Sequence, residues 1–165
     1  MHNHHNHHTM WKPYIMHVLA LIMLCSACSH AGEEVDLRAV YEALQGADKE
    51  AELEKVRAYV IIPQGGCEGC ISSAEQFVID YAKGKPELRF IFTEVNSVKS
   101  LKNRLKEAFF YENVILDPHR SFANLRGENN IYPMIVYLKQ GKAERVDFQS
   151  PGNVYALDEL LKEIE

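Results

Sequence analysis

The chain has 165 residues, of which 47% are hydrophobic and 25% are charged, and its formal net charge is −5. These proportions are typical of a globular domain, and they exclude disordered, collagen-like and coiled-coil chains. We find no repeat with a period of 20–50 residues, which excludes solenoids. A net acidic chain lacks the basic surface that nucleic acids require, so we expect no nucleic-acid partner.

The first 27 residues have the pattern of a signal peptide. We interpret Met10 as the true start of translation and Met1–Thr9 as sequence upstream of it. The apolar run Ile15–Leu24 is too short to cross about 30 Å of hydrocarbon, but it suits the central part of a signal peptide. Small residues precede Cys28, an arrangement that resembles the lipidation site of bacterial lipoproteins. The alternative is an ordinary secretory signal with Cys28 unmodified. Both interpretations place the mature chain outside the cytoplasm, where disulfides persist.

Hydrophobic periodicity predicts the elements that follow Cys28. In the first half they are a tether at Ser29–Glu34, a helix at Val35–Gln45, a charged linker at Gly46–Lys55, a buried strand at Ala58–Pro63, a helix at Cys67–Lys83, a strand at Leu88–Val95 and a helix begun by Ser97 with Val98, Leu101, Leu105, Ala108 and Phe109 inward. In the second half they are a strand at Val114–Leu116, a helical turn at Ser121–Leu125, a hairpin of Met134–Leu138 and Glu144–Phe148, and a helix that carries Val154, Leu157, Leu160, Leu161 and Ile164.

The alternation of strands and helices predicts an α/β fold in three layers. Its sheet is mostly parallel, with helices on both faces and the hairpin as an antiparallel edge. We therefore divide the chain into a signal peptide at 1–27, a tether and helix at 28–56, and a domain at 57–165.

The segment Gly65-Gly66-Cys67-Glu68-Gly69-Cys70 carries the strongest chemical signal. Two cysteines three positions apart, at the point where a buried strand leads into a helix, can form and break a disulfide. Free N–H groups at the helix N-terminus stabilise a thiolate, so Cys67 is the expected nucleophile and Cys70 the resolving thiol. A neighbouring carboxylate opposes that stabilisation, so we expect Glu68 to tune the reactivity of Cys67.

With a second signature, Ile131-Tyr132-Pro133 before an apolar strand, the chain resembles the thioredoxin-fold thiol–disulfide oxidoreductases, in particular the membrane-anchored extracytoplasmic ones. The resemblance spans about residues 58–165. It implies a cis peptide bond before Pro133, beside the redox cysteines, and it implies that the backbone of Tyr132 binds the substrate. We also expect Gly66, in a loop with little side-chain bulk, to let a substrate disulfide approach.

The chain departs from that family at three positions. Gly66 replaces a common Trp, Glu68-Gly69 replaces a common Gly-Pro, and Ile61 replaces the buried acid that assists the resolving thiol. We therefore expect narrower or slower exchange than that of a general reductant.

Other interpretations of the cysteine pair have less support. A zinc site needs four ligands, and the mature chain adds only Cys28, His30 and His119. A copper carrier needs a longer cysteine spacing, a peroxidase needs a Thr where Gln64 stands, and a structural disulfide over so short a loop would add little stability.

The sequence thus predicts a lipid-anchored oxidoreductase that faces the periplasm or the cell exterior. Its expected partners are protein dithiols and disulfides, a redox protein that recharges it, and the membrane; we expect a monomer with no metal or prosthetic group. The competing hypotheses are a binding lipoprotein without catalysis and, with less support, a metal-carrying module.

Overall fold

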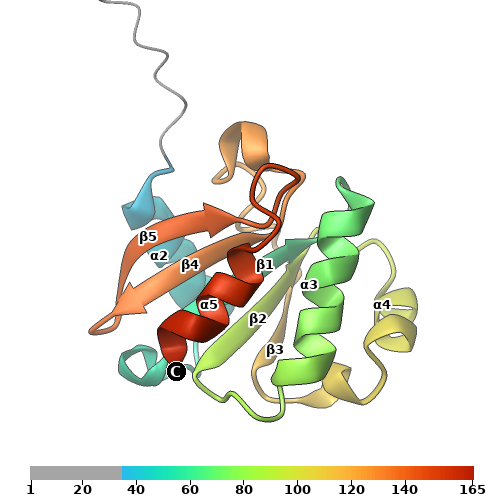
Figure 1. Cartoon of the computed structure of the whole chain (residues 1–165), viewed down its shortest axis with the longest axis horizontal. Helices are drawn as coiled ribbons and strands as arrows, with labels where there is room; N and C mark the ends of the chain where they lie inside the picture. The colour runs from blue at the N-terminus through green and yellow to red at the C-terminus, as the bar shows by residue number, and fades with distance from the viewer. Residues whose placement is uncertain (1–34) are drawn as a thin grey trace, which may run out of the picture. The chain divides into compact units, whose positions relative to one another are not determined.

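A five-stranded mixed sheet lies at the centre of residues 35–165, the part of the chain that this computed structural model describes (Figure 1). Its strands are β1 (Ala58–Pro63), β2 (Leu88–Thr93), β3 (Val114–Asp117), β4 (Met134–Lys139) and β5 (Lys142–Phe148), in the spatial order β3-β2-β1-β4-β5. β1 runs parallel to β2, and β2 parallel to β3, whereas β4 is antiparallel to both β1 and β5. The expected signal peptide, the tether and Cys28 lie outside the described residues.

Within residues 35–165, four α-helices accompany the sheet. They are α2 (Leu37–Ala47), α3 (Glu68–Tyr81), α4 (Val98–Leu105) and α5 (Ala156–Ile164), with short 3₁₀ segments at Leu53–Lys55, Lys106–Phe110 and Gly127–Asn129. Oxygen-bearing side chains cap the start of α2 and α4. The carboxylate of Asp36 accepts from the N–H groups of Arg38 and Ala39, and the hydroxyl of Ser97 accepts from the N–H of Ser100.

The sheet carries a hydrophobic core on each face, as the alternation along β1 shows. Ala58, Val60 and Ile62 face a core that α3, α4 and α5 complete, and Tyr59 and Ile61 face a second core that α2 and Phe122 complete. The predicted three-layer α/β fold is confirmed, and its strand order and helix positions are those of a thioredoxin-like fold. Helix α2 belongs to the same compact unit as the sheet, since Val40 and Leu44 are fully buried in it.

Three local expectations are wrong. The final helix begins at Ala156, so Val154 lies before it and is 54% exposed. Ser121–Leu125 forms successive turns instead of a helical turn, because the carboxylate of Asp117 binds the N–H groups of His119 and Ser121. Helix α4 ends at Leu105, where Lys106 has a φ of 53° and the chain continues as a 3₁₀ segment that still buries Ala108, whereas Val98 of the predicted inward stripe is 48% exposed.

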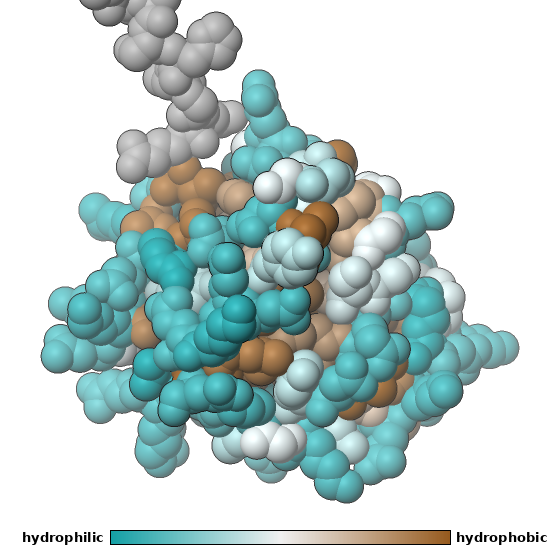
Figure 2. Space-filling view, viewed as in Figure 1, coloured by the Kyte–Doolittle hydropathy of each residue, from teal (hydrophilic) through white to brown (hydrophobic). Residues whose placement is uncertain are grey.

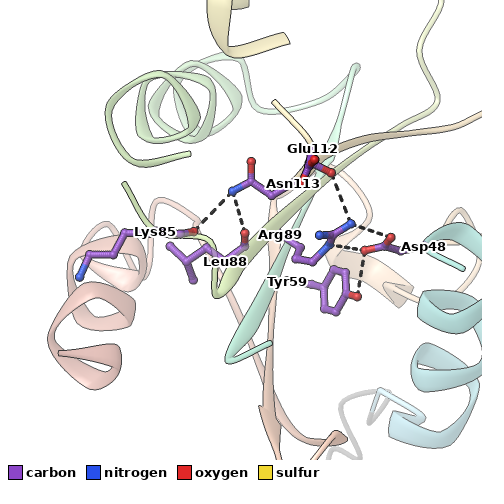
Figure 3. Close-up of polar contacts among 7 residues, drawn as sticks. All are labelled: Asp48, Tyr59, Lys85, Leu88, Arg89, Glu112 and Asn113. Atoms are coloured by element: carbon purple, nitrogen blue, oxygen red, sulfur yellow. Dashed lines mark hydrogen bonds and ion pairs between the residues drawn. The ribbon is translucent and has the colours of Figure 1, made fainter. Parts of the chain in front are cut away.

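A buried polar cluster at the start of the parallel strands fixes α2 to the sheet (Figure 3). Asp48 caps the end of α2, and its carboxylate accepts from the Tyr59 hydroxyl at 3.0 Å and from the Arg89 guanidinium. Burial, reinforced by Asp48, raises the pKa of Tyr59 above its ordinary value. This cluster lies at the edge where the strands begin, whereas the cysteine motif follows the other end of β1.

Candidate thiol–disulfide site

Cys67 and Cys70 lie where β1 gives way to α3. The strand ends at Pro63, three residues form a loop, Cys67 occupies the N-cap position of α3 and the helix proper begins at Glu68. The two sulfurs are joined in a disulfide with a Cα–Cα distance of 5.3 Å. The structure therefore brings together the two residues that the sequence singled out.

The two sulfurs differ in environment. Cys70 is 7% exposed and packs in the first turn of α3, whereas Cys67 is half-buried. The Cys67 sulfur accepts a hydrogen bond from the Cys70 backbone N–H at 3.4 Å, as an N-cap side chain does. Of the two cysteines, Cys67 is therefore the more accessible to solvent. Glu68 is exposed in the first turn of α3, beside this sulfur in the sequence, as expected.

The segment before β4 holds the backbone on the N-terminal side of Cys67. The N–H of Cys67 donates to the Ile131 carbonyl at 3.0 Å. Gly66 has a φ of 127°, and a Cβ added there would lie 2.5 Å from the same carbonyl oxygen. Glycine is thus required at position 66 by the chain's own packing, whereas a Cβ on Gly65 would meet nothing within 4 Å.

Pro133 is buried one residue before β4, and Tyr132 beside it is half-buried. All peptide bonds within residues 35–165 are trans, so the cis bond expected before Pro133 is wrong. The N–H of Tyr132 donates to the Asn129 carbonyl at 3.0 Å and closes a turn. The chain leaves this turn through the trans bond and enters β4, whose first residue pairs with Ile61. The Pro133 carbonyl accepts from Gln149 at 3.0 Å, which fixes the loop before α5 to the same segment.

A charged cluster beside the disulfide was not predicted from the sequence. The Arg104 guanidinium of α4 donates to both carboxylate oxygens of Glu75 in α3, at 2.8 and 2.9 Å, and to the side-chain carbonyl of Gln64. The Gln64 amide in turn donates to Glu75 at 3.3 Å. The Glu75 side chain is only 9% exposed, and its hydrogen bond raises the pKa of Arg104.

A second ion pair supports the loops at the carboxyl ends of the strands. Glu94, after β2, binds Arg120 at 3.0 Å and also the fully buried Arg126, whose Nη1 has no hydrogen-bond partner among the described residues. Burial lowers the pKa of Arg126, and Glu94 opposes that shift. His119 lies in this region with an exposed side chain.

Two shallow pockets lie along the loop that precedes Cys67. One, of about 520 Å³, is bounded by Gln64, Gly66, Glu68, Ser72, Ser97 and Arg104, and the other, of about 430 Å³, by Glu94, Val98, Leu116, Asp117 and Arg120. Gly65 and Asn96 line both pockets. We call their combined depression, on the α4 side of Cys67, the Gly65 groove.

Within residues 35–165, no group of three or more His, Cys, Asp or Glu side chains is placed to hold a metal ion. Among the same residues, no helix has the length and apolar character needed to cross a membrane.

Comparison with known proteins leaves the chain without an assigned family. No protein-family model matches it, and no curated protein does. Among solved structures, it is similar to the pneumococcal exposed lipoprotein thioredoxin (Etrx1) of Streptococcus pneumoniae strain TIGR4, with 18% sequence identity, coverage of 66% of this chain and 87% of that chain, and a TM-score of 0.38. The assignment of a thioredoxin-like fold therefore rests on the strand order and on the place of the cysteine pair between β1 and α3.

Proposed function

We propose that the protein catalyses thiol–disulfide exchange with proteins outside the cytoplasm, through Cys67 and Cys70. The observation that carries this proposal is the disulfide at the N-terminus of α3, with one sulfur accessible and the other buried. This arrangement provides a nucleophile and a resolving thiol within one helical turn. Exchange through a mixed disulfide needs both.

The reaction balances without a prosthetic group. The Cys67 thiolate attacks one sulfur of a partner disulfide, which forms a mixed disulfide and releases the first partner thiolate. Deprotonated Cys70 then attacks the Cys67 sulfur, which re-forms the Cys67–Cys70 disulfide and releases the second thiolate. Two electrons pass to the partner, the released thiolates take up protons, and a second dithiol returns the electrons by the same steps in reverse.

Four neighbouring residues complete the proposed site. Tyr132 and Pro133 line the approach from the side where Ile131 binds the Cys67 backbone, and Gly66 lets that segment lie close. Glu68 adds a negative charge in the first turn of α3, where the helix dipole favours a thiolate on Cys67.

We also propose that Cys28 carries the lipid that holds the domain at the membrane surface. The support is the sequence pattern before Cys28, because bacterial lipoproteins are acylated at such a cysteine. One acyl chain gives marginal affinity and stable anchoring takes two, so loss of Cys28 should release the protein. Membrane fractionation of a Cys28→Ala variant tests this, and retention of that variant at its mature mass would contradict it.

The roles of the two cysteines are tested by trapping partners in cells. We expect Cys70→Ser to accumulate mixed disulfides, because attack by Cys67 is then never resolved, and Cys67→Ser to accumulate few. Non-reducing gels of acid-quenched cells, probed for the protein, show the adducts. Equal trapping by both variants, or trapping by Cys67→Ser alone, would overturn the assignment of the nucleophile.

A further inference from the structure

The loop that leads into Cys67 has few side chains with which to hold itself in place. It consists of Gln64-Gly65-Gly66, between the end of β1 and Cys67, and its two glycines are exposed where the loop borders the Gly65 groove. Glycine also loses more conformational freedom than any other residue when its backbone is fixed. The position of Cys67 therefore depends on the contacts at the two ends of this loop.

The two ends of the loop are held in different ways. At Cys67 the backbone N–H donates to the Ile131 carbonyl at 3.0 Å. At the other end, the half-buried Gln64 side chain accepts from the Arg104 guanidinium through its carbonyl oxygen and donates to the Glu75 carboxylate through its amide at 3.3 Å. We call these two bonds the Gln64 bridge. Both involve a charged partner, which makes them stronger than hydrogen bonds between neutral groups.

The partners of Gln64 are themselves fixed. The Arg104 guanidinium donates to both oxygens of the Glu75 carboxylate, at 2.8 and 2.9 Å, and to the Ser100 hydroxyl at 2.9 Å. The Glu75 side chain is 9% exposed, so little water competes for its bonds. The Gln64 bridge therefore attaches the loop to a well-held pair of side chains on α3 and α4.

The Gln64 bridge connects the two cysteines by a route other than the disulfide. Cys67 lies on the loop side of the junction, as the N-cap of α3, whereas Cys70 and Glu75 both belong to α3. The bond between Gln64 and Glu75 thus ties the loop that leads to Cys67 to the helix that carries Cys70. In the oxidised protein the disulfide makes the same connection. When the disulfide opens, the bridge limits how far the two sulfurs separate.

A bridge that keeps two thiols together raises their effective concentration toward each other. The disulfide then forms more readily, because less conformational entropy is lost when the bond closes. The Gln64 bridge therefore stabilises the disulfide relative to the open pair, and it speeds the attack of Cys70 on a mixed disulfide at Cys67.

We propose that Gln64 is a positioning residue for thiol–disulfide exchange, which holds the loop before Cys67 to α3 while the disulfide is open. Gln64 acts through Cys67 and not by contact with the partner. This inference rests on the proposed function and adds a residue to it. Tyr132 and Pro133 remain the segment that the partner contacts, and Gln64 sets how readily the cysteine pair closes.

The test compares variants of two glutamines in the equilibrium between the purified protein and glutathione, with alkylation to quantify the thiols. In this equilibrium two protein thiols become one disulfide and one oxidised glutathione becomes two glutathione thiols, so electrons and protons balance. Gln64→Met keeps the length of the side chain and removes both polar groups, and Gln64→Leu removes them with a shorter side chain. Gln76→Met is the matched control, since the exposed Gln76 amide donates to the Asp80 carboxylate of the same helix at 2.8 Å.

We expect the equilibrium constant for disulfide formation to fall at least about threefold in Gln64→Met and in Gln64→Leu, and to stay unchanged in Gln76→Met. A merely structural role would lower the stability of the oxidised and reduced protein equally, which leaves this constant unchanged. An unchanged constant in either Gln64 variant, or an equal fall in Gln76→Met, would overturn the positioning role. Unfolding of both oxidised Gln64 variants would also overturn it, because Gln64 would then hold the fold itself.

The two proposals fail in different ways. An unchanged constant in the Gln64 variants removes the role of Gln64 and leaves the proposed function intact. Failure of the natural protein to catalyse the reduction of insulin by dithiothreitol would contradict the proposed function, whatever the Gln64 variants do.

Discussion

The carboxylate of Glu68 and the N-terminus of α3 act on the Cys67 sulfur in opposite directions. The free N–H groups of the first turn stabilise a thiolate, whereas the adjacent exposed carboxylate repels it. An exposed charge in the first turn contributes about 0.3–1 kcal/mol, which is enough to measure but too small to suppress the reactivity of the thiol.

We predict that Glu68→Gln moves the thiolate titration of Cys67 to lower pH by about 0.2–0.7 unit, measured by absorbance near 240 nm in a Cys70→Ser background. Because a more stable thiolate favours the reduced form, the disulfide should also become more oxidising, by about 5–20 mV. Asp80→Asn is the matched control, since it removes the same charge at the other end of α3. A titration that is unchanged, or moved to higher pH, would remove Glu68 from the mechanism.

For individual residues, the sequence identified the reactive cysteine pair but not the contacts that hold its backbone in place. The spacing of Cys67 and Cys70 is a local pattern, and it predicted the disulfide correctly. The need for glycine at position 66 comes from Ile131, 65 positions further along the chain, and no local pattern reports such a contact. The expected cis bond before Pro133 came from resemblance alone, and the structure corrects it.

Between elements, the pair of Arg104 and Glu75 joins α4, α3 and the end of β1. Glu75 lies four positions after Ile71, within the apolar stripe of α3, where periodicity predicts a hydrophobic residue. Its carboxylate is retained there because α4 brings a guanidinium to it, at a distance of 2.8 Å. The sequence could place both helices, but it could not show that these two charges meet.

We predict that Arg104→Met lowers the free energy of unfolding by about 1–2 kcal/mol, because it leaves a buried carboxylate without its cation, with a discount for the partial exposure of Arg104. Urea denaturation of the oxidised domain measures the change. Lys99→Met, an exposed residue of the same helix, is the control and should have little effect. If Arg104→Met and Lys99→Met are equally stable, the pair does not hold α3 and α4 together.

The regular elements were the most predictable part at this scale. β1 is observed with the predicted bounds because a continuous apolar run of that length fits a strand buried on both faces. The hairpin turn at Gln140-Gly141 has positive φ at both residues, as a two-residue turn between antiparallel strands requires. The irregular loop after β3 was not predictable, since it depends on the buried Asp117 and Arg126.

For the molecule as a whole, the fold places the residues proposed for thiol–disulfide exchange at one end of the sheet. The loops after β1, β2 and β3, the N-terminus of α3 and the segment before β4 meet there (Figure 1), while the Asp48 cluster secures the opposite end. On the face drawn in Figure 2, hydrophilic side chains prevail and the hydrophobic ones form separate small groups.

The midpoint reduction potential of the Cys67–Cys70 disulfide tests the central claim most directly, because it separates a disulfide that exchanges from one that only braces the helix. It is measured by equilibrating the purified domain with glutathione or dithiothreitol buffers of stated ratio and quantifying the alkylated thiols. An exchanging pair should lie between about −270 and −120 mV, the range of known thiol–disulfide oxidoreductases. A potential below about −300 mV, typical of structural disulfides, would contradict the proposed function.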